Sequence, residues 1–236
     1  MFRVLNKSAT RAEILIYGDI GPVFWGDEVS AADFAKTLRD VGEVSGLDVR
    51  INSYGGDVFD GLAIYRQLVD HPARVTMHID GIAASAASVI AMAGDVIRIG
   101  ESARVMIHDA WTIGIGDAAS MRETADRLDE TSQALAQIYA DRSGRTATEM
   151  RDAMRAETWY TGQEAIEAGL AHELAKNKRD DVKAAVGERV VALDPQKHRF
   201  KHTPQDLMPG RQAAAALVAR QLVALNLSTA AARKRA

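Results

Sequence analysis

The chain has 236 residues and a formal net charge of −3, with 47% hydrophobic and 26% charged residues, a balance typical of a soluble globular protein. This length suits one large α/β domain, or one domain with an appendage. Cysteine is absent, which excludes disulfides, thiolate zinc sites and a cysteine nucleophile.

The N-terminal segment has no continuous apolar run of the kind that secretory signals contain. The longest apolar stretch, residues 83–93, is far shorter than the roughly 20 residues that a membrane-spanning helix needs. We therefore expect a soluble cytoplasmic protein with no membrane partner.

Short runs rich in β-branched residues alternate with segments of helical periodicity. Gly, Asp and Pro bound the runs, which is typical of buried strands. Alternation of strands and helices indicates an α/β domain built from βαβ units. The expected strands are residues 13–17, 47–52, 75–79, 96–99 and 105–107, and the expected helices are 30–44, with Ser30 as its N-cap, 59–70 and 83–93.

Residues 117–142 predict one long polar helix. Its apolar residues recur at spacings near three, four and seven, so they form a narrow stripe that suits packing against one neighbour. The helix is either a surface helix of the domain or an arm that intercalates with a partner subunit. The stripe alone does not decide between them; it contains Met121, Leu128, Leu135 and Ile138.

The C-terminal part differs in composition from the rest. Residues 1–175 contain 16 Lys/Arg and 27 Asp/Glu, whereas residues 176–236 contain 13 and 5, so a boundary lies near Lys176. Residues 193–210 are polar with three of the five prolines, and residues 211–227 are Ala-rich with Leu and Val at helical spacing. We expect a basic linker and a terminal helix, flexible or cleavable, outside a domain formed by residues 1–175.

Three segments that combine glycine or small residues with reactive side chains follow expected strands. They are NSYGG (52–56), GIAASAAS (81–88) and VMIH (105–108). The carboxyl ends of parallel strands meet at one edge of a sheet, where loops and helix N-termini converge. The three segments therefore predict a site at that edge.

Ser85 is the candidate nucleophile. It lies among small residues at the start of an expected apolar helix, near the positive end of the helix dipole and its unpaired N–H groups. The alternative is that residues 83–88 are only a tightly packed helix start. Ser88 is the competing serine, and its place one turn further along predicts that it is more buried.

His108 is the candidate general base, because it ends a strand and could lie within hydrogen-bond reach of a serine. A lone histidine is more often structural, as His78 inside a strand and His71 beside Pro72 illustrate.

The Gly-Gly pair in residues 53–56 could present backbone N–H groups to a developing oxyanion, or be no more than a turn. The chain contains none of the GxGxxG, GxxxxGK[ST], GxSxG and HExxH patterns, so we expect no nucleotide cofactor, no metal and no α/β-hydrolase.

Taken in this order and spacing, the segments resemble the Clp peptidase family, whose pattern is Asn-Ser-x-Gly-Gly, Gly-x-Ala-Ala-Ser, Met-Ile-His and then Ser/Thr-x-x-Glu-Ala. The last block appears here as TGQEA, and the resemblance covers roughly three quarters of the chain, from about residue 14 to 173. It implies a ClpP/crotonase-like α/β core with residues 117–142 as a protruding handle helix. In the family this handle interlocks two rings, which favours the intersubunit arm.

The resemblance also implies a serine endopeptidase with a Ser-His-acid triad. Backbone N–H groups would form the oxyanion hole, and a peptide substrate would bind as an added β-strand along the loop after the second glycine. The implied residues are Ser85 as nucleophile and His108 as base, Gly55 and Ala86 at the oxyanion hole, and Gly56, Asp57 and Val58 for substrate.

Two positions depart from the family pattern. The usual triad aspartate, four residues before the Ser/Thr of the last block, is replaced by Glu157, which can orient an imidazole but has one more methylene. Asp152 is the fallback acid, and Asp109 is sterically unsuited because it adjoins the histidine. Tyr54 replaces a common proline in the Gly-Gly loop.

Several features resemble phage prohead maturation proteases more than housekeeping Clp subunits: the GIAASAAS and MIHDAW variants, the glutamate and the basic extension. The expected partners are then protein substrates, such as phage scaffold, portal or capsid proteins, and further copies of the chain in a heptameric ring or stacked rings. The alternatives are a bacterial ClpP paralogue working with an AAA+ unfoldase, a catalytically silent ring-forming scaffold, and an acyl-CoA enzyme of the crotonase fold.

Overall fold

The computed structural model describes residues 2–8, 10–21, 30–175 and 200–204, so almost all of the predicted extension, including the helix at 211–227, lies outside the described residues. The strands are β1 (Phe2–Lys7), β2 (Arg11–Tyr17), β3 (Gly46–Ser53), β4 (Arg74–Ala84), β5 (Val96–Ile99), β6 (Arg104–Ile107), β7 (Thr158–Thr161) and β8 (Glu173–Leu174). The helices are α1 (Ala31–Val41), α2 (Val58–Val69), α3 (Ala86–Ala91), α4 (Ala118–Ser143), α5 (Ala147–Arg155) and α6 (Gly162–Glu167).

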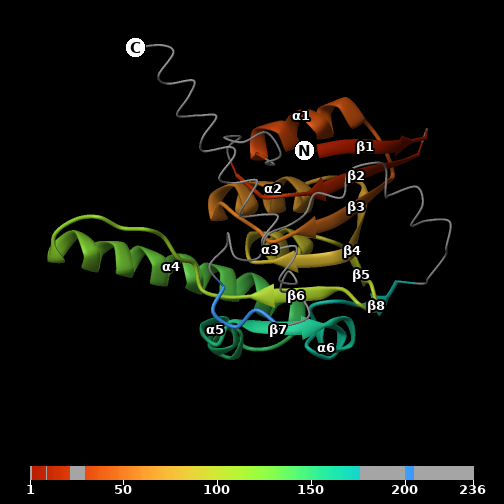
Figure 1. Cartoon of the computed structure of the whole chain (residues 1–236). Helices are drawn as coiled ribbons and strands as arrows, with labels where there is room; N and C mark the ends of the chain where they lie inside the picture. The colour runs from red at the N-terminus through yellow and green to blue at the C-terminus, as the bar shows by residue number, and fades with distance from the viewer. Residues whose placement is uncertain (1, 9, 22–29, 176–199, 205–236) are drawn as a thin grey trace, which may run out of the picture. The chain divides into compact units, whose positions relative to one another are not determined.

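The strands form one sheet (Figure 1) in the order β1-β2-β3-β4-β5-β8, with β6 paired to β4 and β7 paired to β6. Strands β2, β3, β4 and β5 pair in parallel, and so do β4 and β6, whereas β1 and β7 join antiparallel. The α/β class and the five expected strands are confirmed. The sequence analysis missed β1, α5, β7, α6 and β8, which are short or lie beyond the expected core.

Strand β4 divides the sheet. Its first half, Thr76–Ile79, pairs with β5, and its second half, Ile82–Ala84, pairs with β6. The expected helix at 83–93 is therefore wrong at its start, because Ala83 and Ala84 are bonded into the sheet and α3 begins only at Ala86. Pairing with β6 outweighs the helix preference of these alanines, since both are fully buried between neighbouring strands. Because the second half of β4 pairs with β6, Ser85 lies at the edge of the sheet where β6 also ends.

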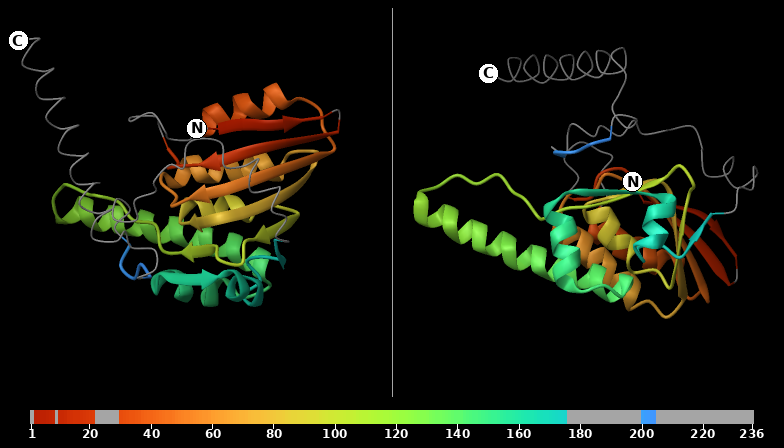
Figure 2. Two further views of the ribbon diagram at one scale, coloured as in Figure 1. Left: turned by 45° about the vertical axis from the view of Figure 1, so that its right-hand side comes forward. Right: turned by 90° about the horizontal axis from the view of Figure 1, so that it is seen from below.

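The sheet has one apolar and one charged face. In β3 the buried residues Leu47, Val49 and Ile51 alternate with Asp48 and Arg50, which are only partly buried. The apolar face packs into a core with residues of α1, α2 and α3, which lie along one side of the sheet (Figure 2). The expectation of a buried strand therefore holds for one face of β3, whereas ion pairs and partly buried charged residues lie on its second face.

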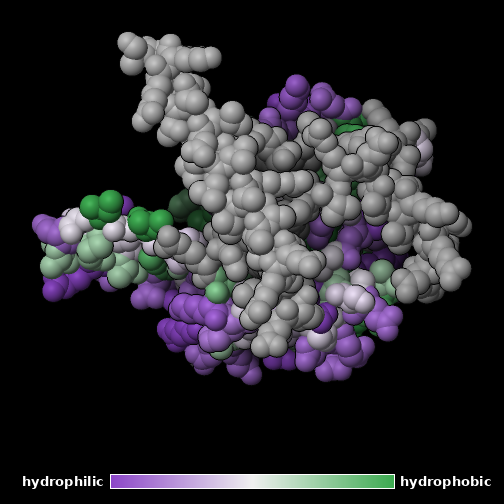
Figure 3. All heavy atoms as spheres, viewed as in Figure 1, coloured by the Kyte–Doolittle hydropathy of each residue, from purple (hydrophilic) through white to green (hydrophobic). Residues whose placement is uncertain are grey.

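Helix α4 projects away from the sheet (Figures 1 and 2). The side chain of Asp117 caps its first turn by accepting a hydrogen bond from the Ser120 N–H at 2.9 Å. The residues before it run back along the projecting half of the helix, and apolar side chains gather on this arm (Figure 3). Within that segment Ile113 and Ile115 are 69% and 97% exposed. The helix is therefore anchored at its C-terminal half, whereas its N-terminal half is mostly exposed and has only the preceding segment alongside it.

Among the helices that the structure describes, none has an apolar stretch that could span a membrane.

The charged face predicts how stability depends on pH. Burial by itself would raise the pKa of Asp48, but hydrogen bonds from His78 and Arg11 outweigh it and lower that pKa. A lowered pKa stabilises the fold above the unfolded-state value of about 4 and ceases to do so as pH falls through the lower folded-state value. We expect Asp48→Asn to reduce the free energy of unfolding by about 1–2 kcal/mol at pH 7. Urea denaturation at pH 7 and pH 3 measures this.

The loss should shrink as pH falls below about 4, since the unfolded chain then takes up a proton that the folded protein binds only at a lower pH. Asp70→Asn is the matched control, because Asp70 pairs with Arg66 at the exposed surface of one helix and should contribute under about 0.5 kcal/mol. Equal losses in both variants at pH 7 would contradict the assigned role of Asp48.

Candidate active site

The turn after β4 holds Ser85 in a conformation that residues other than glycine rarely adopt, with φ 53° and ψ −129°. Its N–H donates to the carbonyl of Met106 in β6 at 3.0 Å, which ties the turn to the neighbouring strand. Of the described non-glycine residues, only Ser85 and Glu157 have positive φ. Such backbone strain persists where the surroundings over-determine it, and it gathers at functional sites.

Ser85 and His108 meet at the edge predicted from the sequence. His108 follows β6 directly, and its Nε2 atom lies 2.7 Å from Ser85 Oγ. Both side chains are partly exposed. The strand pairing explains the contact, because β6 pairs with the half of β4 that ends at Ala84. The structure therefore brings together the two residues on which the predicted chemistry depends.

Glu157 immediately precedes β7, and His108 immediately follows β6. Strands β6 and β7 are antiparallel, and the last pair of their register joins Ile107 to Thr158. Glu157 is 5% exposed and accepts a long hydrogen bond, 3.4 Å, from the Trp159 indole N–H. The strand pairing therefore brings the backbone of a residue with a buried carboxylate to the end of β6 that leads into the histidine.

The two other acids considered from the sequence have different partners. Asp152 lies on α5 with an exposed side chain and pairs with Arg155 at 3.3 Å. Asp109 receives two hydrogen bonds from Arg151, at 2.8 and 3.1 Å. Neither contact points to a role in orienting His108, which leaves Glu157 as the candidate acid.

Ser88 is fully buried, as expected from its place one turn into the helix. Its hydroxyl lies 2.6 Å from the carbonyl of Ser85 and 2.7 Å from Tyr139 Oη. It is therefore bonded inside the protein, which removes it as a competing nucleophile.

Gly55 lies against the turn that contains Ser85. A Cβ at this position would meet the Ala84 carbonyl at 2.6 Å and the Ala86 nitrogen at 2.9 Å, and φ is +97°, so only glycine fits. As the first residue of α3, Ala86 has no intrahelical acceptor for its N–H. The Gly55 N–H donates to Ser53 Oγ at 3.0 Å, so this donor would have to be shared with an oxyanion. The sequence did not reveal that competing bond.

Backbone groups of the expected substrate loop already form hydrogen bonds within the protein. Gly56 forms a bridge with Ile20, and the Asp57 N–H donates to the Ile20 carbonyl at 2.8 Å. The Asp57 carbonyl accepts from Gly61, and Val58 is the first residue of α2. The Asp57 N–H is therefore already used inside the protein and is not available to donate to a substrate strand.

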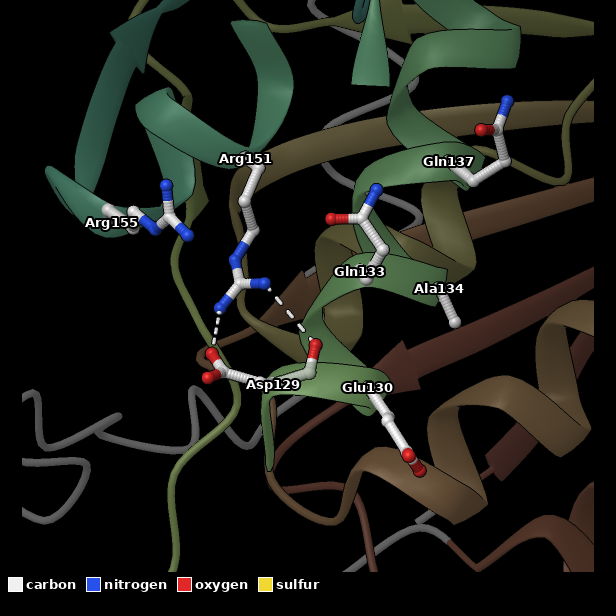
Figure 4. Close-up of a pocket in the computed structure, with 7 residues that line it drawn as sticks. All are labelled: Asp129, Glu130, Gln133, Ala134, Gln137, Arg151 and Arg155. Atoms are coloured by element: carbon white, nitrogen blue, oxygen red, sulfur yellow. Dashed lines mark hydrogen bonds and ion pairs between the residues drawn. The ribbon is translucent and has the colours of Figure 1, made fainter. Parts of the chain in front are cut away.

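Arg151 is a residue that the sequence analysis missed. It reaches from α5 to Asp109, next to the histidine, and to Asp129 of α4, whose carboxylate accepts at 2.6 Å and whose backbone carbonyl accepts at 3.2 Å (Figure 4). Its side chain is 7% exposed, and the hydrogen bond that it donates to Asp109 raises the pKa of Arg151 above its usual range. Nearby, the Ala110 N–H donates to Ser132 Oγ of α4 at 3.0 Å. These contacts fix the chain that leaves His108.

The comparisons with known proteins agree with this architecture. The model of the Clp protease family matches residues 32–178. The ATP-dependent Clp protease proteolytic subunit 1 of Protochlamydia amoebophila is 30% identical over 175 residues, covering 70% of this chain and 84% of its own. The ATP-dependent Clp protease proteolytic subunit of Ligilactobacillus salivarius is 30% identical over 170 residues with the same coverage, and that of Bacteroides fragilis is 33% identical over 134 residues, covering 56% of this chain and 65% of its own.

A fold of this class, with a forked parallel sheet and a projecting helix, is that of a ClpP-like peptidase. The chain belongs to the Clp protease family. The family expected from the sequence is therefore confirmed. The relatives named are bacterial Clp subunits, so the narrower expectation of a phage prohead protease stays a prediction.

The Arg151 contacts predict an unequal response to two arginine substitutions on α5. Arg151→Leu should lower the free energy of unfolding by about 1–3 kcal/mol, because Asp109 and Asp129 lose a buried partner. Arg155→Ala is the matched control, since this exposed arginine pairs only at the helix surface with Asp152 and should change stability by less than about 0.5 kcal/mol. Urea denaturation followed by circular dichroism measures both, and a smaller loss for Arg151→Leu would contradict the prediction.

Proposed function

We propose that the chain is a serine endopeptidase in which Ser85 is the nucleophile, His108 the general base and Glu157 the residue that orients the imidazole. The observation that carries the proposal is the 2.7 Å contact between Ser85 Oγ and His108 Nε2. This distance lies in the range that proton transfer between a nucleophile and its base requires. Membership of a peptidase family supports it.

The proton positions follow from the donor inventory of the groups. For His108 Nε2 to accept the Ser85 proton, the imidazole must be neutral and carry its own proton on Nδ1. A carboxylate facing Nδ1–H would hold this tautomer and stabilise the imidazolium that forms. Glu157 is suited to this role, because it is buried and directly precedes β7, the strand that pairs with the one leading to His108.

The reaction then proceeds in two balanced halves. Ser85 Oγ bonds to the scissile carbonyl carbon while its proton passes to His108, and the leaving amine takes that proton as the peptide C–N bond breaks. Water next attacks the acyl ester, giving its proton to His108, and Ser85 recovers a proton as the acid product leaves. The Ala86 N–H, and the Gly55 N–H when it is shared, stabilise the negatively charged oxygen, at about 3 kcal/mol per donor.

The narrower proposal is prohead maturation, with scaffold, portal or capsid proteins as substrates. It is supported by the GIAASAAS and MIHDAW variants and by Glu157 at the position of the usual aspartate. The competing proposal is a ClpP paralogue that receives chains from an AAA+ unfoldase, and the similarity to ATP-dependent Clp protease subunits favours it. In both, copies of the chain would assemble through the projecting half of α4 and the segment before it, in which Ile113 and Ile115 are exposed.

Labelling by a fluorophosphonate tests the serine mechanism, because only an activated serine reacts. We expect one label per chain by intact mass, located on Ser85, and none in Ser85→Ala. Ser102→Ala is the matched control, since Ser102 lies in an exposed turn and should leave labelling unchanged. A folded parent that takes no label, or a label that persists in Ser85→Ala, would refute the proposal and favour a silent scaffold or an acyl-CoA enzyme.

The identity of the acid is tested by Glu157→Gln. The amide cannot stabilise the imidazolium and can favour the wrong tautomer, so kcat for a fluorogenic peptide should fall by at least about 100-fold. Asp152→Asn should leave kcat within twofold of the parent, because this carboxylate is exposed and pairs with Arg155. The reverse pattern in the two variants would transfer the role to Asp152.

A further inference from the structure

A buried chain of hydroxyl groups connects α4 to the turn of the proposed nucleophile. Tyr139 Oη in α4 lies 2.7 Å from Ser88 Oγ in α3, and Ser88 Oγ lies 2.6 Å from the backbone carbonyl oxygen of Ser85. Tyr139 is 1% exposed and Ser88 is fully buried. An alanine and a phenylalanine could fill the same space without burying two hydroxyls, which is costly unless each is hydrogen-bonded.

The direction of these hydrogen bonds is fixed by counting protons. The Ser85 carbonyl can only accept, so the single Ser88 hydroxyl proton must be donated to it. Tyr139 must therefore donate to Ser88, and its own hydroxyl is the start of the chain. Burial strongly raises the pKa of Tyr139, which keeps this proton in place.

The carbonyl at the end of the chain belongs to the peptide group whose N–H is that of Ala86. It already accepts from the backbone N–H of Ser88 at 2.9 Å and that of Val89 at 3.3 Å. A further donor on the oxygen polarises the peptide group and makes its N–H a stronger donor, because linked hydrogen bonds reinforce one another. It also restrains rotation of the peptide plane.

We infer that Tyr139 and Ser88 are positioning residues that orient and polarise the Ala86 N–H as the oxyanion donor. This inference rests on the proposed function. Because the Gly55 N–H is shared with Ser53 Oγ, the Ala86 donor carries the larger part of the oxyanion stabilisation, and the hydroxyl chain strengthens that donor. Tyr139 comes from the anchored half of α4, so the helix contributes to the chemistry as well as to the shape of the subunit.

Kinetics of Tyr139→Phe test the inference, since this change removes one oxygen and preserves the ring. We expect kcat to fall about two- to fivefold with KM unchanged, as a partial weakening of one oxyanion donor would produce. The inhibition constant of a peptide boronate, whose tetrahedral adduct places an oxygen at the oxyanion position, should rise by the same factor. Tyr65→Phe is the matched control on α2 and should change neither quantity.

Ser88→Ala is the second variant, and it keeps the test decisive if Tyr139→Phe folds poorly. It removes the donor to the Ser85 carbonyl itself and should lower kcat at least as much. The kcat of the double variant should be no lower than that of Ser88→Ala, because the chain of hydroxyl groups is already interrupted. Unchanged kcat in the folded variants, a change confined to KM, or additive losses in the double variant would overturn the inference.

A spectroscopic readout separates this inference from the proposed function. With ¹³C-carbonyl serine and ¹⁵N-alanine, HNCO spectra detect only Ser-Ala pairs, which occur at 8–9, 30–31, 85–86 and 102–103. The 85–86 signal is assigned by its loss in Ser85→Ala. We expect Tyr139→Phe to move that signal alone, and Tyr65→Phe to move none.

The outcomes of the two tests are then distinct. An 85–86 signal that stays in place in Tyr139→Phe overturns the hydroxyl chain, whatever the enzyme's activity. If Tyr139→Phe moves the 85–86 signal but Ser85 of the parent takes no fluorophosphonate label, the chain of hydroxyl groups is supported and the peptidase mechanism is refuted.

Discussion

The turn between β4 and α3 is the constraint on which the site depends. Ser85 has a positive φ that costs free energy for a residue with a side chain, and three groups of contacts maintain it. The Met106 carbonyl accepts a hydrogen bond from the Ser85 N–H. Gly55 packs so closely against the turn that a Cβ at position 55 would not fit. Ser88 and Val89, at the start of α3, donate to the Ser85 carbonyl. These contacts fix the turn, so the Ser85 side chain lies at the edge of the sheet where β6 ends.

Strand pairing supplies the rest of the proposed triad. The same half of β4 that leads to Ser85 pairs with β6, which leads to His108, and β6 pairs with β7, which begins just after Glu157. Each proposed residue thus lies immediately outside a ladder of backbone hydrogen bonds. A site built at strand ends inherits the rigidity of the sheet, whereas a site on long loops would have to be ordered when substrate binds.

The anchored half of α4 contacts both sides of this arrangement. Tyr139 contacts the turn of Ser85 through Ser88. On the other side, Ser132 bonds directly to the segment that follows His108, and Asp129 is linked to that segment through Arg151. The projecting half of the same helix, with the apolar segment beside it, is left uncovered. An exposed apolar surface and the neighbourhood of the proposed catalytic residues are therefore joined by one helix.

The sequence by itself determined the strand–helix alternation, the α/β class, the family and the pairing of Ser85 with His108, because local periodicity and short motifs encode them. Tertiary structure alone decided that β4 continues through Ala84, since alanine has little strand preference and only pairing with β6 holds it there. It alone set the partners of the Gly55 and Asp57 N–H groups and the neighbours of Arg151 and Tyr139. Apart from the bond between Gly55 and Ser53, which are two residues apart, these contacts join segments whose separation along the chain leaves no periodic pattern, so they follow from the fold and not from local preference.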